Sequence, residues 1–406
     1  MTNGIPFPGD NGIPMMGWGL VRGMLARDIK VTVVGLCNED DKSCSQIFIQ
    51  DLMALGVTVE VLQYRKPELK QKGFMSILDR LSFSQLYPAS LLTTKVSSML
   101  SEIQADAIIA VHTEPLSALL NCKNDIPVLG IMGDPTSQPA YFRWKYLDVQ
   151  KISSLIFNRF WLAVLSYYYN KFDVEMLKAC VGRGVVAAQY VKWFSNRGVE
   201  QCDYFPIPIH DDGLQITDRY KKGFGASKNK KIIMLGALHT TVTKVGLKYF
   251  SENLYSVIEK ELKFDFKIHI IGSGQWPSDI AKPDTDKVVL RGYVDDLSKD
   301  WLDADILLVP TNIELGIRAR ILTALSKGMC VVAHLANVQG IPELVHGYNC
   351  ILGATPDELV DGMNEIFSDS NYAENISRNA RATYEKIFSE EVASSKIIDK
   401  VMSILK

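Results

Sequence analysis

The stretch that decides the fold is Pro310-Thr-Asn-Ile-Glu314-Leu-Gly316-Ile-Arg318-Ala-Arg320-Ile-Leu-Thr323-Ala-Leu-Ser-Lys-Gly328. It follows an apolar run, Ile306 to Val309, that predicts a buried parallel strand, and it leads into a helix. The free backbone N–H groups at the start of such a helix form an anion site, and two arginines there favour a diphosphate. Glu314 beside an anion site indicates that the ligand also carries hydroxyl groups. The anion site and the carboxylate together favour a nucleotide sugar as the ligand.

The chain has 406 residues, and 47% of them are hydrophobic and 22% charged. This length exceeds what one hydrophobic core usually supports, so we expect two domains. The net charge of −2 gives no basic field for nucleic acid, so no nucleic-acid partner is expected.

Seven cysteines are scattered along the chain without C-x-x-C spacing, which argues against structural zinc and favours a reducing cytosol. We find no apolar signal-peptide core and no apolar run of about 18 residues that would span a bilayer. The sequence therefore predicts a cytoplasmic protein that is soluble or peripheral to a membrane.

The first half alternates short apolar runs with helical segments, beginning with a helix near Met15–Arg27. Non-alternating apolar runs between helices predict a parallel sheet covered on both faces. The predicted strands are 31–36, 57–62, 107–111, 126–132 and 184–188. A doubly wound domain normally opens with a strand before its first glycine loop, yet this chain starts at Gly4 almost on that loop. Either the biological start lies upstream, or the first strand is very short.

A second alternating series starts after the proline-bracketed segment Phe205–Ile209 and a polar, lysine-rich connection. Its predicted strands are 232–235, 266–271, 288–290, 306–309, 330–333 and 350–352, and the tail from Asn371 is predicted to be helical throughout. We therefore expect an α/β fold of two Rossmann-like doubly wound domains facing a cleft. The domain boundaries are 1–205 for the N-terminal domain, 206–230 for a linker, 231–385 for the nucleotide-binding domain, and 386–406 for a final helix that packs back on the N-terminal domain.

Six segments between Ile232 and Leu352 resemble the group-1 (family 4) glycosyltransferases, which have the two-domain GT-B fold. The matching segments, in the order of the family, are Leu235–His239 with Gly246–Phe250, Ile268–Gly274, Val288–Leu297, Asp303–Pro310, Glu314–Thr323 and Gly340–Asn349. The N-terminal half resembles the family more loosely, through the glycine loop Gly9–Gly12 and through the strand that ends in His112.

The opening stretch departs from the family pattern at one position. The family usually has two glutamates, the first near the donor sugar and the second on the ribose hydroxyls. Glu314 matches the first, whereas Thr323 stands at the second. A threonine hydroxyl binds ribose more weakly than a carboxylate does. The Gly-x-Arg-x-Arg arrangement resembles a subgroup with Gly-Thr-Arg-x-Lys before this helix, so the resemblance supports phosphate binding better than ribose recognition.

The resemblance implies a set of donor-binding residues: Gly12, Gly236, His239, Lys244, Gly292, Tyr293, Glu314, Gly316, Ile317, Arg318, Arg320 and Thr323. A regular helix cannot aim Arg318 and Arg320 at one point. We prefer Arg318 for the phosphate, with the other arginine paired to a surface carboxylate. Lys244 and His239 have the plainer alternative of exposed polar side chains.

Three residues are candidates for catalysis: His112, Glu314 and Asp134. His112 is either an acceptor-side base or proton donor or a structural histidine at a strand end. Glu314 either holds the donor sugar or caps its helix. The Asp303-Ala-Asp305 string, which resembles a metal-binding motif, is interpreted as structural. We expect no cofactor and no obligatory metal.

Residues 152–172 contain many aromatic side chains flanked by Lys151, Arg159 and Lys171. This pattern suits an interfacial helix that contacts a membrane, and a core helix or a dimer contact are the alternatives. Membrane contact would place the protein at the inner face of the membrane.

The resemblance implies a hexosyltransferase-type glycosyltransferase. It would move a sugar from a nucleoside-diphosphate sugar to a saccharide or lipid-linked acceptor hydroxyl, with retention and without metal, in bacterial polysaccharide or glycolipid synthesis. The alternatives are a nucleotide-sugar 2-epimerase of the same fold and a non-catalytic partner subunit. The base, sugar, acceptor and oligomeric state are not predicted by the sequence.

Overall fold

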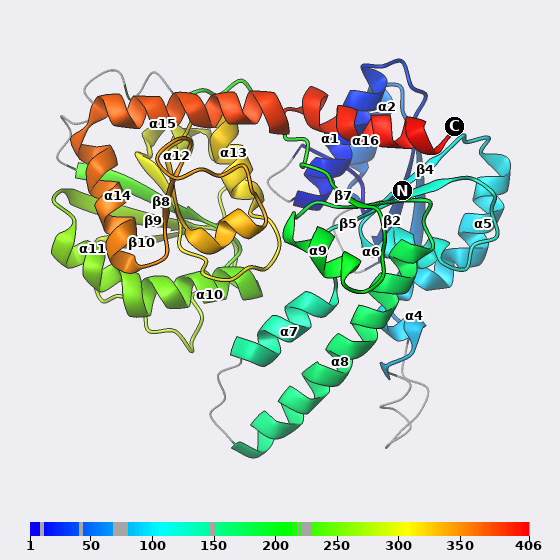
Figure 1. Cartoon of the computed structure of the whole chain (residues 1–406), viewed down its shortest axis with the longest axis horizontal. Helices are drawn as coiled ribbons and strands as arrows, with labels where there is room; N and C mark the ends of the chain where they lie inside the picture. The colour runs from blue at the N-terminus through cyan, green and yellow to red at the C-terminus, as the bar shows by residue number, and fades with distance from the viewer. Residues whose placement is uncertain are drawn as a thin grey trace. The chain divides into compact units, whose positions relative to one another are not determined.

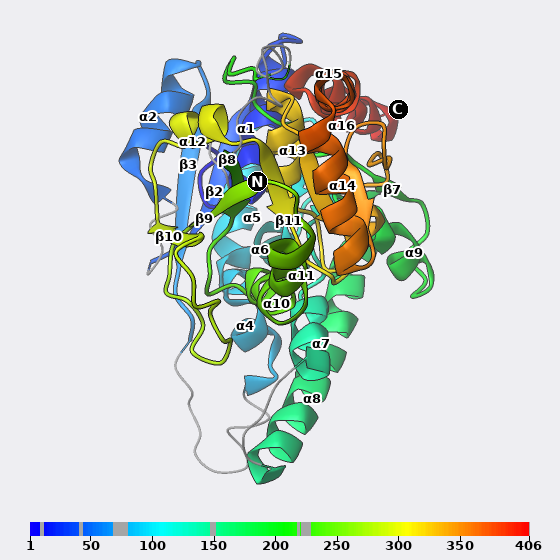
Figure 2. The same ribbon diagram turned by 90° about the vertical axis from the view of Figure 1, so that its left-hand side faces the viewer.

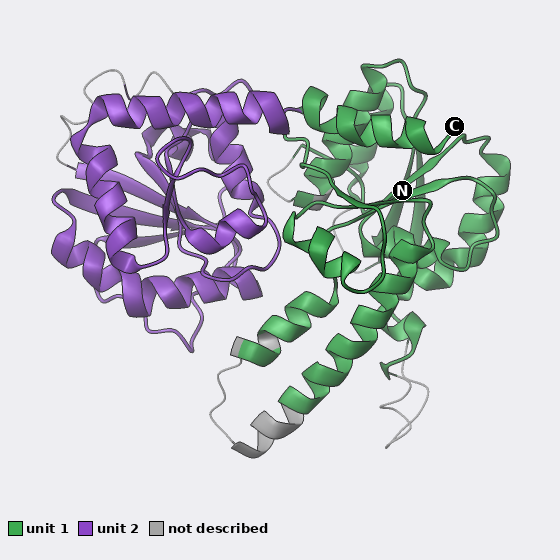
Figure 3. Cartoon of the chain, in the orientation of Figure 1, with its two compact units in different colours: residues 1–210, 390–406 green, residues 211–389 purple. Residues whose placement is uncertain are grey.

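The computed structural model describes residues 1–8, 12–39, 44–67, 80–146, 152–216, 220 and 229–405. The predicted glycine loop at 9–11 and most of the predicted connection, 221–228, lie outside the described residues. The chain divides into two compact units (Figure 3). Unit 1 comprises Met1–His210 and Glu390–Lys406, and unit 2 comprises Asp211–Ser389.

Among the described residues, unit 1 contains a three-stranded parallel sheet in the order β1-β2-β3 and a four-stranded parallel sheet in the order β4-β5-β6-β7; several of these strands are labelled in Figure 1. The strands are β1 (Thr2–Asn3), β2 (Thr32–Asn38), β3 (Thr58–Tyr64), β4 (Ile108–Val111), β5 (Val128–Met132), β6 (Gly182–Val185) and β7 (Cys202–Tyr204). The chain start at β1 connects the two sheets. It pairs with β2, while the Met1 carbonyl accepts from the Val111 amide at 3.0 Å and the Met1 amino group donates to the Ile109 carbonyl at 2.7 Å.

The helices of unit 1 are α1 (Gly12–Leu25), α2 (Gln46–Ala54), α4 (Phe83–Leu86), η2 (Pro88–Leu92), α5 (Thr93–Glu102), α6 (Thr113–Leu119), α7 (Ser137–Tyr146), α8 (Ile152–Lys178), α9 (Gln189–Ser195) and α16 (Glu390–Ile404). Helix α16 packs on α1 at Gly23, where any side chain would collide with Ser394. Glu390 at the start of α16 bonds Arg22 at 3.1 Å and His210 at 3.2 Å. The final helix thus completes unit 1.

Unit 2 contains six parallel strands in the order β10-β9-β8-β11-β12-β13, which is the 3-2-1-4-5-6 order of dinucleotide-binding sheets. The strands are β8 (Asn229–Leu235), β9 (Asp265–Ile271), β10 (Val288–Gly292), β11 (Ile306–Val309), β12 (Val331–His334) and β13 (Ile351–Gly353). Every residue of β11 is buried, as its continuous apolar sequence predicts. The predicted α/β fold class is confirmed.

The helices of unit 2 are α10 (Thr241–Tyr249), α11 (Tyr255–Glu261), α12 (Ser298–Asp303), α13 (Ala319–Lys327), η5 (Leu335–Gln339), α14 (Pro356–Ser368) and α15 (Ser370–Thr383), with π-helical turns at Phe250–Leu254 and Tyr384–Phe388. In Figure 1, α10 and α11 lie on one side of the sheet, and α13 and α15 lie on the other. Figure 2 shows the same elements turned by 90° about the vertical axis.

One prediction from the sequence is wrong, and one feature was not predicted. The tail is not one helix, because Ser389 adopts an extended conformation that ends the π-helical turn before α16 begins. Cys37 and Cys44 form a disulfide, with a Cα–Cα distance of 6.1 Å, which the scattered cysteine spacing did not indicate. The other five cysteines are free. None of the described helices is long and apolar enough to cross a membrane.

Candidate functional site

The carboxyl ends of β8 and β11 lie side by side at the centre of the unit 2 sheet. The strand order reverses between these two neighbours, since β8 leads to β9 on one side and β11 leads to β12 on the other. Ligands of doubly wound sheets bind at this switch point, outside the carboxyl ends of the strands. The segments that leave β8 and β11 there are the glycine loop at Gly236 and the stretch quoted first, Pro310–Gly328.

Gly236 and Gly272 bring two loops into direct contact. Gly236 has φ 147°, and its amide donates to the Ile271 carbonyl at 3.0 Å. A side chain on Gly272, which has φ 157°, would overlap the Gly236 carbonyl. Leu238 then donates its amide to Ser273 at 2.8 Å. Only glycine tolerates this backbone conformation and contact. The two glycines therefore determine how closely the loops after β8 and β9 pack at the switch point.

Arg320 spans the ends of the two central strands. Its Nη1 donates to the Leu235 carbonyl at the end of β8, and its Nη2 lies 3.5 Å from the Thr311 hydroxyl beyond β11. The side chain is half-buried, and its Nε has no hydrogen-bond partner. Burial, with a smaller effect of the neighbouring Arg318, lowers the pKa of Arg320 to about 9. A bound anion would relieve this unfavourable burial of a cation.

Arg318 lies just before the helix and not in it, because α13 begins at Ala319 and Arg318 is its N-cap residue. Helical spacing therefore does not prevent the two arginines from binding one ligand. The Arg318 guanidinium donates to the Leu315 and Ile317 carbonyls of its own turn. Gly316, with φ 68°, allows this turn to fold back. Glu314 precedes it and is exposed, as a residue that contacts a ligand requires.

The expected carboxylate partner of the second arginine is not among the contacts described for Arg320. Those contacts are the Leu235 carbonyl and the Thr311 hydroxyl. Thr311 also lies under α10, where a side chain on Gly246 would approach its hydroxyl to 2.9 Å. Thr311 thus connects α10, β11 and α13, a role that its place after a strand does not predict.

Helix α10 begins five residues after Gly236, at Thr241. The hydroxyl of Thr240 accepts from the amide of Thr243 at 3.4 Å and caps the helix. His239 and Lys244 are both exposed beside this start, and His239 lies against the loop at Gly274. Their positions fit either a ligand contact or the plainer role of polar surface side chains.

The remaining predicted donor residues lie at the same edge of the sheet. Gly292 ends β10 with φ 70° and open space around it, and Tyr293 beyond it is 70% exposed. Ile317 belongs to the turn before α13 and is partly exposed, and Thr323 lies one helical turn after Arg320 on α13 and is also partly exposed. All the donor candidates of unit 2 therefore belong to segments that follow β8, β10 or β11.

The Asp303-Ala-Asp305 segment lies between the end of α12 and the start of β11. Asp305 accepts from the Lys231 amide at 2.6 Å, and the Lys231 ammonium lies 3.7 Å from Asp303 and 3.1 Å from Asp300. These contacts hold the start of β8 against the start of β11, at the end of the sheet opposite the glycine loop. The string serves structure here, as its place before an apolar strand predicts.

In unit 1, His112 and Asp134 come from neighbouring strands. The His112 amide donates to the Ile131 carbonyl at 2.8 Å, which places the histidine beside the Gly133-Asp134 turn. The His112 Nδ1 lies 2.7 Å from the Glu114 carboxylate. Burial lowers the pKa of His112, but Glu114, Asp134 and Asp173 together outweigh it and raise the pKa above its ordinary value. Gly12, the N-terminal residue of α1, is partly exposed.

Sequence reasoning missed Glu114 and Asp173. Asp173 on α8 is fully buried; it accepts from the Tyr87 hydroxyl at 2.6 Å and from the Ser137 amide at 3.2 Å. Burial raises the pKa of Asp173 to about 7. Glu114 could have been noticed two residues after His112. Asp173 is hidden in an aromatic helix and carries no motif.

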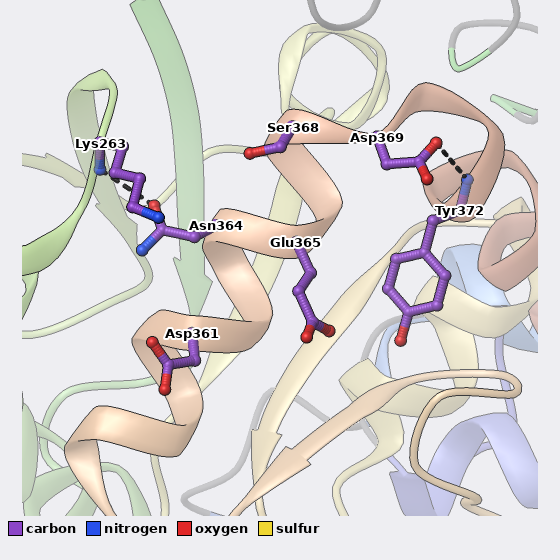
Figure 4. A pocket seen from close by; sticks show the side chains of 7 residues that line it. All are labelled: Lys263, Asp361, Asn364, Glu365, Ser368, Asp369 and Tyr372. Atoms are coloured by element: carbon purple, nitrogen blue, oxygen red, sulfur yellow. Dashed lines mark hydrogen bonds between the residues drawn. The ribbon is translucent and has the colours of Figure 1, made fainter.

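An open pocket lies elsewhere in unit 2, lined by Lys263, Asp361, Asn364, Glu365, Ser368, Asp369 and Tyr372 (Figure 4). Asn364 bonds the Lys263 amide at 3.0 Å, and Asp369 caps α15. These contacts are structural, and no predicted donor residue lines the pocket. We therefore place the candidate site at the switch point and not here.

Helices α7 and α8 run side by side and extend away from the sheet of unit 1 (Figures 1 and 2). Side chains of the predicted aromatic segment at 152–158 lie outside the described residues. Beyond them, Phe160 and Tyr167 on α8 are each 66% exposed, and Tyr141 and Trp144 on α7 are 40% and 37% exposed. Phe160 and Tyr167 are seven residues apart and share one helix face. The segment is therefore not simply a core helix.

Comparison with protein families gives a match over residues 229–369 to the model described as glycosyl transferases group 1. This range contains the switch point, Arg318 and Arg320, and the match identifies a group-1 domain in unit 2. No curated protein matches the chain by sequence.

Three solved structures illustrate the fold that this chain shares. Anabaena HepE in complex with UDP-glucose superposes with a TM-score of 0.62 at 16% identity, covering 97% of each chain. Sucrose-phosphate synthase from Thermosynechococcus elongatus gives 0.65 at 11% identity, covering 100% of this chain and 96% of its own. The lipopolysaccharide outer core galactosyltransferase WaaB gives 0.59 at 12% identity, covering 98% of each. The chain therefore has the GT-B fold.

Proposed function

We propose that the protein transfers a sugar from a nucleoside-diphosphate sugar to an acceptor hydroxyl. The observation that carries this proposal is the placement of Arg320 across the ends of β8 and β11 in a group-1 glycosyltransferase domain. The solved complex of HepE with UDP-glucose, although only 16% identical, supports a sugar nucleotide as the donor.

In this proposal the diphosphate lies between the start of α10 and the start of α13. Arg320 and Arg318, with the positive dipole ends of both helices, balance the charge that grows on the leaving diphosphate. Glu314 holds hydroxyls of the donor sugar and fixes its orientation. Transfer proceeds with retention by front-face attack, and the departing phosphate takes the acceptor proton.

We propose that no metal ion is required. The Asp303 and Asp305 carboxylates, which would be the first candidates for a metal, are engaged with Lys231. Positive side chains at the switch point supply the charge that a metal otherwise supplies to a leaving diphosphate. Activity in the presence of a chelator tests this point directly, and a loss of activity that Mg²⁺ or Mn²⁺ restores would contradict it.

On the acceptor side, we propose that the α7–α8 pair contacts an anionic membrane that presents a lipid-linked acceptor. Exposed Phe160 and Tyr167 supply apolar area, and exposed Arg159 and Lys145 supply positive charge nearby. This arrangement would place the enzyme at the inner face of the membrane, in polysaccharide or glycolipid synthesis.

Co-sedimentation with phosphatidylglycerol vesicles tests the membrane contact. A Phe160→Ser, Tyr167→Ser variant should bind several-fold less, whereas Ile47→Ser should bind as the parent does. Ile47 is a matched control because it is an exposed apolar residue of the same unit, 65% exposed on α2. Equal binding by all three proteins would exclude this surface.

The donor site is tested by thermal shift with UDP, GDP, ADP and TDP, followed by the sugar nucleotides of the base that binds. We expect one nucleoside diphosphate to raise the melting temperature, because a ligand that binds only the folded state stabilises it. Incubation with the sugar nucleotide alone should leave the sugar unchanged, and epimerisation without acceptor would overturn the transferase assignment. No shift with any nucleotide would contradict the donor site itself.

A further inference from the structure

His112 is held in a backbone conformation that few residues adopt. It has φ 80° and ψ 177° at the end of β4, where it is the N-cap residue of α6. Such an angle is unfavourable for a residue other than glycine and persists only where its surroundings impose it. The conformation points to a role for the position of this ring.

The ring edge of His112 lies against the turn after β5. A β-carbon on Gly133 would lie 2.9 Å from Cδ2 and 3.3 Å from Nε2 of His112, so only glycine leaves room for the imidazole. About 20% of the histidine side chain is exposed. The ring therefore sits at the carboxyl ends of β4 and β5, which is where doubly wound domains bind their ligands.

The other ring nitrogen is bound by a carboxylate. Nδ1 of His112 lies 2.7 Å from Oε2 of Glu114, and the Thr113 hydroxyl donates to the same oxygen at 3.1 Å. The Glu114 carboxylate is thus oriented by two donors from consecutive residues. At this distance the contact is a charge-assisted hydrogen bond, which is stronger than a neutral one.

The groups around the ring all favour a positive charge on it. Glu114 comes from α6, Asp134 from the turn after β5 and Asp173 from α8, and the Tyr87 hydroxyl bonds Asp173. Burial opposes the charge, but these carboxylates raise the pKa of His112. Burial likewise tends to raise the pKa of Glu114, yet His112 and Thr113 bring it below its ordinary value. Both directions favour the ionised pair, an imidazolium beside a carboxylate, over the neutral pair.

We propose that Glu114 is a positioning residue that holds His112 as an imidazolium, so that Nε2–H donates a hydrogen bond to an oxygen of the bound substrate. The sequence left open whether His112 acts as a base or as a donor, and this geometry assigns the donor. In the ionised pair Nδ1–H is used by Glu114, and Nε2–H remains for the ligand. The identity of that ligand rests on the proposed function, but the ion pair does not.

Histidine NMR tests the pair in the free protein. The six histidines can be separated by ring 15N shifts, and His112→Gln assigns the signal. In the parent protein we expect both ring nitrogens of His112 to be protonated at pH 7. Glu114→Gln keeps the shape and removes the charge, so the His112 titration midpoint should fall by at least about one pH unit, a tenfold loss of proton affinity.

Two further variants make the test decisive. Glu102→Gln removes an exposed carboxylate on α5 of the same unit and should leave the His112 titration unchanged. Glu114→Asp, for use if the glutamine variant unfolds, shortens the carboxylate and should give an intermediate shift. An unprotonated Nε2 at pH 7 in the parent, or the same midpoint in all variants, would overturn the proposal.

The catalytic part has its own readout. In Glu114→Gln the high-pH limb of the rate profile should move to lower pH by the shift that NMR measures, with activity recovering toward acid pH. His112→Gln should lose activity at every pH. A merely structural Glu114 would lower the rate without moving this limb. If no sugar transfer is found at all, the proposed function fails while the NMR result still decides the ion pair.

Discussion

The guanidinium of Arg320 occupies the space where a side chain on Gly236 would begin. The two residues are far apart in sequence, yet α13 brings the arginine against the first loop after β8. The glycine loop and the Arg320 side chain therefore pack directly against each other. A substitution at Gly236 should therefore shift the Arg320 side chain, and a substitution at Arg320 should alter the loop.

Gly236→Ala should weaken nucleoside-diphosphate binding and lower stability together. Alanine at φ 147° is strained, and its methyl group would displace the Arg320 guanidinium. We expect at least about a tenfold rise in Kd, which corresponds to roughly 1.4 kcal/mol, and a melting temperature several degrees lower. Calorimetry and thermal melts measure the two effects.

Gly213→Ala is the matched control for backbone strain alone. Gly213 belongs to the same unit and has φ 79°, but nothing lies within 4 Å of its missing β-carbon. This variant should lose stability and keep its nucleotide affinity. If Gly236→Ala behaves in the same way, the contact with Arg320 has no part in binding.

Arg320→Met should separate stability from binding. Removing a cation whose burial lowers its pKa to about 9 should leave the ligand-free protein as stable as the parent or more so. Losing its hydrogen bonds to phosphate should raise the Kd for a nucleoside diphosphate by about 10- to 100-fold. Affinity for the nucleoside should hardly change.

Arg318→Met is the companion variant. Arg318 donates to the carbonyls of its own turn, so its loss should loosen the Glu314–Arg318 turn as well as weaken diphosphate binding. A larger loss of binding in Arg318→Met than in Arg320→Met would support the prediction from the sequence that Arg318 is the main phosphate ligand. Equal losses for nucleoside and diphosphate in both variants would refute the phosphate role.

Much of the fold was predictable because buried parallel strands appear in the sequence as continuous apolar runs. Buried runs such as Ile306–Val309 are apolar throughout, and all four residues are buried in β11. The short β1 was harder, since Thr2 and Asn3 carry no strand pattern. Their strand exists because Thr2 and Asn3 pair with Gly35 and Leu36 of β2, while the preceding Met1 carbonyl accepts from the Val111 amide.

The site was predictable in its parts but not in its connections. Glycines and arginines in family order indicated the switch point, whereas the link from Arg320 to Leu235 depends on how α13 packs. Asp173 could not be predicted at all. Its partners Tyr87 and Ser137 are distant in sequence, and the aromatic helix around it reads as apolar.

Thr323→Val tests what remains of ribose recognition. Thr323 lies one turn after Arg320 on α13, where the resembled family has a glutamate. If its hydroxyl binds ribose, the valine variant should lose about 2- to 10-fold in affinity, as expected for one neutral hydrogen bond. The loss should be the same for nucleoside and nucleoside diphosphate, unlike that of Arg320→Met. Unchanged affinity for both would show that Thr323 does not contact the ribose.

Asp173 should make the stability of unit 1 depend on pH. Burial raises its pKa from an ordinary 3.8 to about 7 in the folded protein. Between these values the folded state binds more protons than the unfolded chain, so the free energy of unfolding falls as pH rises through this window and levels off above it. The decrease should be on the order of a few kcal/mol, at about 1.4 kcal/mol per pH unit.

Urea titrations at pH 5 and pH 8, followed by amide exchange in β5 and α8, report on unit 1 alone. Asp173→Asn should lose most of the pH-dependent difference, because an amide retains an acceptor for the Tyr87 hydroxyl and does not ionise. Asp106→Asn, which changes an exposed aspartate of the same unit, should keep the parent's difference. A parent protein that is equally stable at both pH values would mean that Asp173 stays ionised, held so by the hydrogen bonds from Tyr87 and Ser137 that stabilise its carboxylate.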